Sequence, residues 1–278
     1  MLIEGKIALI PGASRPIGRA IAKKFGSKGA CLILPVFDWP DSIIEMEEEF
    51  QAADFDYISI PTDLRQKDEV LRLAKVIETR YGSLDYLINN IERGGMPVVH
   101  GSYDLPHNEN QWNLEIETTM KAKWLLFNHL FYLMKNCQGA SVVNLSSIAA
   151  LIGRSGPAAV FFSEGYSAAN KAIQSFTETW AQEAAPTVRV NELMLGLIRN
   201  RHGEGTRGWE LLTDHEKESL QKSILLKRTG FPEEVAAAVY YLAVEASYIT
   251  GSILRMDGGF ALGDRVVPSI PPGVLSQE

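Results

Sequence analysis

The sequence predicts a single doubly wound α/β domain built on a seven-stranded parallel sheet. Short apolar runs rich in β-branched residues alternate along the chain with stretches whose apolar residues recur at helical spacing. The apolar runs are nearly continuous, which is typical of strands that helices cover on both faces. With 278 residues, 46% of them hydrophobic, the chain is long enough to bury one large core.

The elements follow one another in the order strand, helix, strand. The first strand is apolar and β-branched, and the helix after it is expected to end at a glycine, Gly29. Strands are expected at residues 6–10, 31–37, 57–61, 84–89, 140–145, 188–194 and 252–256. Helices are expected at residues 17–29, 41–50, 67–81, 111–134, 163–185 and 232–246, with a polar, mobile helical segment at 207–223.

Composition excludes several classes of protein. The longest apolar runs are interrupted well before the ~20 residues that a membrane span needs, and the N-terminus does not have the pattern of a signal peptide. The net charge of −7 without a basic cluster makes nucleic acid an unexpected partner. The histidines and cysteines show no metal-ligand spacing, and Cys31 and Cys137 are expected to be reduced, which suits a cytoplasmic protein.

A glycine-rich loop follows the first strand and opens the first helix. It contains Gly12, Ser14, Arg15, Ile17 and Gly18. Glycines at such a turn allow the backbone to approach a pyrophosphate, which the N-terminus of the next helix stabilises. The loop therefore predicts a dinucleotide site.

From this loop onward the chain resembles the short-chain dehydrogenase/reductase family, over roughly residues 3 to 263. Pro11 and Pro16 replace a threonine and a glycine of the family's loop. Pro16 suits the first turn of a helix but has no N–H to offer a phosphate. Asn89 and Asn90 match the family's strand-four motif, whereas Ile91 and Glu92 replace its two small residues. The resemblance implies a Rossmann-like fold and an NADP(H) or NAD(H) cofactor.

Three features bear on the choice of cofactor. The resemblance gives Arg15 a position that often contacts the 2′-phosphate of NADP, and arginine suits bidentate phosphate binding. The position expected to carry an acid for the ribose of NAD is Val36, and Asp38 is interpreted as a turn residue or a displaced ribose ligand. The pattern favours NADP. The resemblance also implies that Asp63, after the third strand, contacts the adenine, a role compatible with capping the next turn.

The resemblance implies a catalytic set of Ser147, Tyr166, Lys171 and Thr119. In the family a tyrosine is the general acid/base, a lysine lowers its pKa and binds the nicotinamide ribose, and a serine binds the substrate oxygen. Thr119 stands where the family has an asparagine of a proton relay. Asn89 and Lys171, together with Gly196 and Ile198 after the sixth strand, are the remaining expected cofactor contacts.

The spacing of the tyrosine and the lysine departs from the family. Four residues on a helix leave two side chains ~40° apart, whereas the five that separate Tyr166 from Lys171 leave them ~140° apart. Ser147 and Tyr166 are also nineteen residues apart, more than is usual in the family. Three hypotheses follow: Tyr166 reaches the site through a π-bulge or a late helix start, Tyr166 points away, or another acid such as Glu164 serves.

The C-terminal half supports the same fold. The segments at residues 228–236 and 249–259 are similar to family segments, and residues 199–209 are expected to form a substrate lid in which Trp209 and Leu211 cover an apolar substrate or merely pack on the surface. We expect one domain over residues 1–265 and an extended tail over 266–278.

The resemblance implies an NAD(P)(H)-dependent oxidoreductase that interconverts a carbonyl and an alcohol on a small organic substrate. It also implies a homodimer or homotetramer built on the helices at 111–134 and 163–185. The alternative hypothesis is a catalytically degenerate binding, regulatory or assembly subunit, because Pro16, Glu92, Thr119 and Ser167 all depart from the family pattern.

Overall fold

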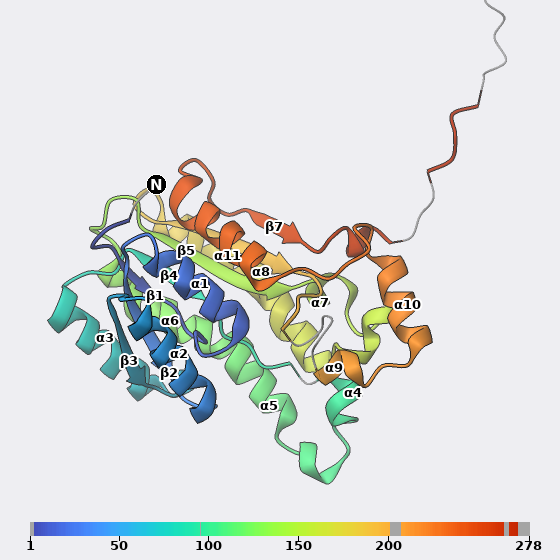
Figure 1. The fold of residues 1–278 in the computed structure, drawn as a ribbon. Coiled ribbons are helices and arrows are strands. Elements are labelled where there is room, and N and C mark those ends of the chain that lie inside the picture. Colours follow the sequence, from blue (N-terminus) through green and yellow to red (C-terminus); the bar gives the residue numbers. More distant parts are fainter. Residues whose placement is uncertain (1–2, 95, 201–206, 264–266, 272–278) are drawn as a thin grey trace, which may run out of the picture.

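A computed structural model describes residues 3–94, 96–200, 207–263 and 267–271 of the chain. Within these residues one parallel sheet forms the centre of the molecule (Figure 1). Its strands are β1 (Ile7–Leu9), β2 (Cys31–Val36), β3 (Tyr57–Pro61), β4 (Tyr86–Asn89), β5 (Ser141–Ser147), β6 (Arg189–Leu195) and β7 (Ile253–Met256). Their order is β3-β2-β1-β4-β5-β6-β7, which confirms the predicted doubly wound, seven-stranded sheet.

Helices cover both faces of this sheet. The α-helices are α1 (Pro16–Gly26), α2 (Pro40–Ala52), α3 (Lys67–Tyr81), α4 (Pro97–His100), α5 (Gln111–Ile116), α6 (Ala122–Leu130), α7 (Ala149–Ile152), α8 (Glu164–Ala184), α9 (Arg207–Glu210), α10 (Asp214–Ser223) and α11 (Pro232–Tyr240). Helices α1, α2 and α11 pack on one face, and α3, α6 and α8 on the other. Figure 1 shows α1 and α11 side by side.

Each strand contributes side chains to two hydrophobic cores, because successive side chains point to opposite faces of the sheet. Ala8 and Ile10 pack with α1 and α11, whereas Ile7 and Leu9 pack with α3 and α6. Both positions are therefore apolar, which explains the nearly continuous apolar runs of the sequence.

The expected long helix at 111–134 is interrupted. It consists of α5, a π-helical turn η2 (Glu117–Lys121), α6 and a 3₁₀ turn η3 (Phe131–Leu133). A second π-helical turn, η5 (Tyr241–Glu245), extends α11. Each such turn holds one extra residue and so rotates the later side chains by roughly 100°, while the spacing within each helix on either side stays regular. Helical spacing in the sequence therefore predicted the helices but not the interruptions.

The long interval between Ser147 and Tyr166 is filled by short elements that the sequence did not predict. These are α7 and the 3₁₀ helix η4 (Gly156–Val160). After them the fully buried Phe161 and Phe162 join a third apolar cluster, to which Tyr166 also belongs. The extra residues thus pack the tyrosine from one side, and the Phe162 and Tyr166 rings stack with centroids 6.1 Å apart.

The predicted lid and tail lie partly outside the described residues. Of the lid, residues 201–206 are not described, and Trp209 is buried in the third cluster while Leu211 is exposed. Of the tail, residues 267–271 are described and form neither helix nor strand. In the part of the chain that the structure describes, no helix is both long enough and apolar enough to cross a membrane.

The aromatic residue Phe25 tests the core between α1, α11 and the sheet. Its ring is fully buried and meets those of Tyr86 and Tyr240 edge-to-face, with centroids 5.7 Å and 5.5 Å away. We expect Phe25→Ala to lower the free energy of unfolding by about 3–5 kcal/mol in urea denaturation. The matched control Phe37→Ala, at a ring that is 60% exposed, is expected to cost less than about 1 kcal/mol. Equal losses for the two variants would contradict this assignment of the core.

Candidate active site

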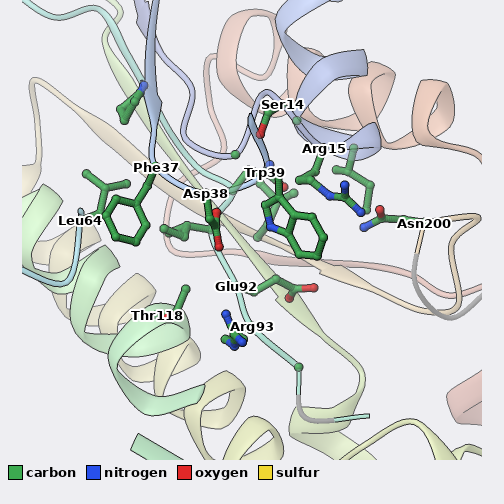
Figure 2. Close-up of a pocket in the computed structure, with 18 of the residues that line it drawn as sticks. Ser14, Arg15, Phe37, Asp38, Trp39, Leu64, Glu92, Arg93, Thr118 and Asn200 are labelled. Carbon is green, nitrogen blue, oxygen red and sulfur yellow. The ribbon is translucent and has the colours of Figure 1, made fainter. Parts of the chain in front are cut away.

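A cleft of about 640 Å³ opens at the carboxyl ends of the strands (Figure 2). Loops that follow β1, β2, β3 and β4 line it, and they contribute the glycine loop, residues 36–39, residues 62–65 and residues 90–94. The sheet order reverses between β1 and β4, and such a reversal is where doubly wound sheets bind ligands.

The glycine loop and the turn after β4 cross in direct contact. A Cβ added at Gly18 would lie 2.2 Å from the Gly12 carbonyl oxygen and 2.6 Å from the Asn90 amide nitrogen. Asn90 Nδ2 donates a hydrogen bond to the Pro11 carbonyl at 3.1 Å. Gly12 has a φ of +70°, which favours glycine. Both glycines are therefore required for this crossing, and Pro16 sits exposed at the first turn of α1.

The predicted phosphate ligand Arg15 borders the cleft. Its guanidinium lies over the Trp39 ring, 4.5 Å from the centroid, and donates to Ser42 Oγ at 3.2 Å. Figure 2 shows the Arg15 and Trp39 side chains lying together. Val36 and Asp38 line the neighbouring wall. The Arg15 guanidinium and the Trp39 ring therefore lie together at this end of the cleft, where they could contact a bound ligand.

Asp63 also lines the cleft, but its carboxylate is paired with an arginine. Arg65 Nε and Nη2 each donate to it at 2.8 Å. Burial would raise the pKa of Asp63, and the Arg65 guanidinium reverses this effect and lowers the pKa below its ordinary value. Arg65 in turn lies over the Phe37 ring, 5.4 Å from the centroid.

Tyr166 meets Glu92 at the other end of the cleft. The phenol donates a hydrogen bond to Glu92 Oε2 at 2.8 Å, and Glu92 borders the cleft. The Tyr166 side chain is only 1% exposed. The α8 helix begins at Glu164, capped by Ser163, and continues without a π-bulge. Neither a π-bulge nor a late helix start absorbs the extra residue before Lys171, because α8 already begins before Tyr166, but the phenol contacts a residue that lines the cleft.

Lys171 does not lie beside Tyr166. The structure therefore does not bring together the tyrosine–lysine pair that the resemblance implied. Lys171 lies on the exposed face of α8, where its amine donates to Gln174 at 2.9 Å. Because α8 is regular, the five-residue spacing turns the two side chains to different faces. The residue four after Tyr166 is Asn170, which is fully buried. Its Nδ2 donates to the Tyr166 carbonyl, and its Oδ1 has no hydrogen-bond partner among the described residues.

A different lysine is buried beside the cleft. Lys123, on α6, has no solvent exposure and donates from Nζ to the Leu145 carbonyl at 2.5 Å. Burial lowers its pKa to about 8, and the negative charges of Glu92 and Glu192 act in the opposite direction. At neutral pH this amine therefore remains mostly protonated within the protein.

Thr119 lies in the π-helical turn η2 and binds the segment that carries Glu92. Its Oγ1 accepts a hydrogen bond from the Arg93 N–H at 3.1 Å. Thr119 is fully buried, and its neighbour Thr118 is the residue that borders the cleft. The side chain predicted for a proton relay thus fixes the backbone next to Glu92.

Ser147 ends β5 and is 4% exposed. Its Oγ accepts a hydrogen bond from the Ala149 N–H at 3.2 Å, as in a turn cap. Glu164, the alternative acid, is exposed and pairs with Arg154 at 3.1 Å. This placement leaves Tyr166 and not Glu164 beside the cleft.

A buried carboxylate joins the helix of Tyr166 to the segment before α5. Glu115 is fully buried and accepts hydrogen bonds from the Tyr103 hydroxyl at 2.6 Å and the Ser163 hydroxyl at 2.9 Å. The Tyr103 oxygen also accepts from the Gly165 N–H at 2.9 Å. Burial raises the pKa of Tyr103 to about 12, so this phenol stays protonated.

Of the residues expected to bind the cofactor, six line the cleft, namely Gly12, Ser14, Arg15, Ile17, Gly18 and Asp63. Asn89 lies instead within the sheet, where its Nδ2 donates to Asn144 Oδ1 at 2.8 Å, and Asn90 borders the cleft. Gly196 packs against Asp257, and Ile198 bridges to Gly230. After β6 it is Leu195 and Asn200 that border the cleft.

Sequence reasoning missed two residues of the site. Glu92 was noted only as a departure from the family pattern, whereas it accepts the hydrogen bond of the phenol. Lys123 received no role, although it lies four residues after Thr119 and just before an apolar run. That helical spacing was the available signal.

The residues at the adenosine end fit a dinucleotide. The crossing at Gly12 and Gly18 has no room for a Cβ, so the backbone forms the surface there, and Ser14 and Arg15 supply polar groups at the N-terminus of α1. The described residues contain no group of side chains that could hold a metal ion.

Comparison with known proteins agrees with this geometry. A family model described as enoyl-(acyl carrier protein) reductase matches residues 12–261. A 3-oxoacyl-[acyl-carrier-protein] reductase of Thermotoga maritima is 29% identical over 94% of this chain and 100% of its own length. Glucose 1-dehydrogenase 2 of Bacillus subtilis is also 29% identical, over 94% of this chain and 96% of its own.

Solved structures show the same fold. A putative short-chain alcohol dehydrogenase from Sinorhizobium meliloti superposes with a TM-score of 0.80 at 22% identity, over 94% of this chain and 98% of that chain. The ligand-free aldohexose dehydrogenase of Thermoplasma acidophilum superposes with a TM-score of 0.73 at 27% identity, over 96% of this chain and 98% of its own. The chain belongs to the short-chain dehydrogenase/reductase family of NAD(P)-dependent oxidoreductases.

Proposed function

We propose that this enzyme interconverts a carbonyl and an alcohol on a small organic substrate and prefers NADP(H) to NAD(H). The observation that carries the proposal is the Tyr166 phenol, which is hydrogen-bonded to a residue of the same cleft that the glycine loop lines. A general acid/base close to a dinucleotide surface is what carbonyl reduction needs.

The residues would divide the work as follows. The nicotinamide, when bound, supplies or takes up the hydride. Tyr166 exchanges the proton with the substrate oxygen, and Ser147 donates a hydrogen bond to that oxygen. Thr119 holds the backbone of residue 93 and so fixes the segment beside the phenol. The hydrogen bond from the phenol to Glu92, a residue that lines the cleft, supports this assignment of Tyr166.

Two observations support NADP. The Arg15 guanidinium is held by a cation–π contact with Trp39 and by a hydrogen bond to Ser42. A guanidinium held in place in this way suits binding of a 2′-phosphate. Val36 supplies no acid for the ribose hydroxyls at the end of β2.

The walls of the cleft bear on the substrate. Met96, Val99 and Leu195 border it on the side of residues 92–100, so we propose a substrate with an apolar group beside its carbonyl. The relatives at 29% identity are named for an acyl thioester and for a sugar, so overall similarity does not select between these classes.

We also propose that copies of the chain associate through the helices at 111–134 and 163–185. Trp112 and Trp124, on α5 and α6, are exposed to solvent in the single chain. Large apolar side chains of this kind are enriched at interfaces between proteins.

Cofactor binding tests the proposed function directly. We expect NADPH fluorescence to be enhanced when the protein is titrated into it, with saturation at micromolar protein concentration, and NADH to bind more weakly. Absence of binding by either nucleotide at millimolar concentration would refute the oxidoreductase proposal for this cleft.

The Arg15→Ala variant tests the preference for NADP. Because the variant removes a charge-assisted contact to the 2′-phosphate, we expect the Kd for NADPH to rise by about 10–100-fold and the Kd for NADH to change less than about threefold. The control is Lys23→Ala, which removes a surface cation that pairs with Glu49. A similar weakening of both nucleotides by Arg15→Ala would exclude the phosphate role.

The Tyr166→Phe variant tests the acid/base. With a substrate found by screening ketones and alcohols, we expect kcat to fall by about 10²–10⁴-fold, because the ring remains and only the proton donor is lost. The Kd for NADPH should stay within about threefold of the wild-type value. The matched control, Tyr132→Phe at an exposed tyrosine, should leave kcat unchanged. Unchanged turnover by Tyr166→Phe would remove this residue from the mechanism.

A further inference from the structure

Tyr166 lies in the first turn of α8, where a helix is least constrained. The helix begins at Glu164, so Tyr166 is its third residue. The first N–H groups of a helix have no partner within the helix, and helix ends fray for this reason. A phenol that exchanges a proton with substrate must stay at a fixed place relative to the reacting oxygen. The first turn of α8 therefore needs partners from outside the helix.

Two hydroxyl groups provide these partners. The Ser163 hydroxyl oxygen accepts a hydrogen bond from the Tyr166 N–H at 3.4 Å, and the Tyr103 hydroxyl oxygen accepts one from the Gly165 N–H at 2.9 Å. Ser163 is the residue that precedes the helix, which is the usual position of a capping serine. Tyr103 comes from the loop between α4 and α5, so its contact ties α8 to a distant part of the chain.

Both hydroxyl groups donate their hydrogen to the same carboxylate oxygen. Glu115 Oε2 accepts from Tyr103 at 2.6 Å and from Ser163 at 2.9 Å. Because a hydroxyl has one hydrogen, each oxygen then acts only as an acceptor toward the N–H groups of α8. The other carboxylate oxygen, Oε1, accepts from Gln111 Nε2 at 3.0 Å. Glu115 thus sets the direction of both hydroxyl groups.

The carboxylate lies directly against the backbone of α8. Glu115 is fully buried, and a Cβ added at Gly165 would lie 2.6 Å from its Oε2 and 3.0 Å from the Tyr103 hydroxyl oxygen. The Tyr103 ring meets the Trp112 ring edge-to-face, with centroids 5.7 Å apart. Burial of a carboxylate is costly unless hydrogen bonds replace its water, and three neutral donors do so here. The group is therefore held rigidly in place.

The helical segment formed by α5 and η2 also holds the loop that borders the cleft. Thr119, four residues after Glu115, accepts a hydrogen bond from the Arg93 N–H at 3.1 Å. Glu115 binds Tyr103 at the other end of this loop, and Val99 between them lines the cleft. One helical segment thus fixes both a wall of the cleft and the start of α8.

We propose that Glu115 is a positioning residue for Tyr166. Its buried carboxylate orients the Tyr103 and Ser163 hydroxyls, and these hydroxyls hold the first turn of α8 and, with it, the phenol beside Glu92. Because Tyr166 is the acid/base only under the proposed function, this role of Glu115 rests on that proposal. Glu115 acts through the two hydroxyls and takes no part in proton transfer.

Amide hydrogen exchange tests this positioning without substrate or cofactor. Tyr103→Phe removes the acceptor of the Gly165 N–H, and Ser163→Ala removes the acceptor of the Tyr166 N–H. We expect each variant to exchange its own amide about 10-fold faster than the wild type, as followed by NMR at one pH and temperature. Glu115→Leu should accelerate both amides, because both hydroxyls lose the group that directs them.

Glu115→Gln is the conservative variant that should restore the arrangement. Its amide oxygen can accept from both hydroxyls, and Gln111 can turn its own carbonyl oxygen toward the new amide nitrogen. We expect exchange rates and kcat within about threefold of the wild-type values. Equal losses in Glu115→Gln and Glu115→Leu would show that the site uses the negative charge itself, and would overturn the proposal.

The matched controls remove the same groups from exposed positions. Tyr132→Phe removes an exposed phenol hydroxyl on η3, and Ser175→Ala removes an exposed serine hydroxyl further along α8. Neither control should change the exchange of the Gly165 and Tyr166 amides or kcat. An effect of the controls equal to that of Tyr103→Phe and Ser163→Ala would overturn the proposal.

Kinetics separate positioning from simple support of the fold. With the substrate used for Tyr166→Phe, we expect Tyr103→Phe and Ser163→Ala each to lower kcat by about 10-fold and to leave the Kd for NADPH within about threefold of the wild-type value. Faster exchange with unchanged kcat would show a helix cap without a catalytic role and would overturn the proposal, as would unchanged exchange. If Glu115→Leu does not fold, the two hydroxyl variants carry both measurements.

The two proposals fail in different measurements. Unchanged turnover by Tyr166→Phe refutes the proposed acid/base. A normal loss of turnover in Tyr166→Phe, together with unchanged kcat in Tyr103→Phe and Ser163→Ala, refutes only the positioning role of Glu115.

Discussion

The crossing of the glycine loop and the turn after β4 is the constraint on which the site depends. The backbone at Gly12 and Gly18 and the side chain of Asn90 occupy a space that admits no additional carbon atom. This contact joins β1 to β4 at the point where the strand order reverses. Glu92 lies two residues after Asn90 in the same loop, so the position of that carboxylate depends on the crossing.

Below the site, polar side chains connect the central strands. Asn89 donates to Asn144, Asn144 donates to Thr177 at 3.0 Å, and Thr177 donates to Glu192 at 3.3 Å. Ser146 also donates to Glu192, which is fully buried. Burial raises the pKa of Glu192, and these donors together with the charge of Lys123 limit the rise. Buried polar groups are tolerated here because each donor that links the strands has an acceptor.

The fold could be predicted from the sequence almost completely. Alternating apolar runs and helical spacing gave every strand of the sheet within about two residues, because burial on both faces leaves a strong pattern. The glycine crossing could also be predicted, since a close backbone contact leaves glycines that are visible in the sequence. Both signals are local.

The catalytic end could not be predicted in the same way, because its residues come from separate elements. Tyr166 was found through its motif, but its partner lies 74 residues earlier in the chain. In the sequence, Glu92 is only a departure from the family pattern, and Lys123 is an ordinary lysine. These residues come together only in the folded chain, and no spacing in the sequence predicts that proximity. The placement of Lys171 on the outer face, by contrast, follows from the five-residue interval that the sequence already contains.

The buried Glu115 ties the segment before α5 to the start of α8. Tyr103 belongs to the segment before α5, and its hydroxyl binds both Glu115 and the first turn of the helix that carries Tyr166. Glu115 is fully buried, so leaving its carboxylate without these partners would be costly. The segment that carries Tyr103 and the first turn of the helix that carries Tyr166 are consequently held together as one unit, so a change in the position of Tyr103 would be transmitted to the start of α8.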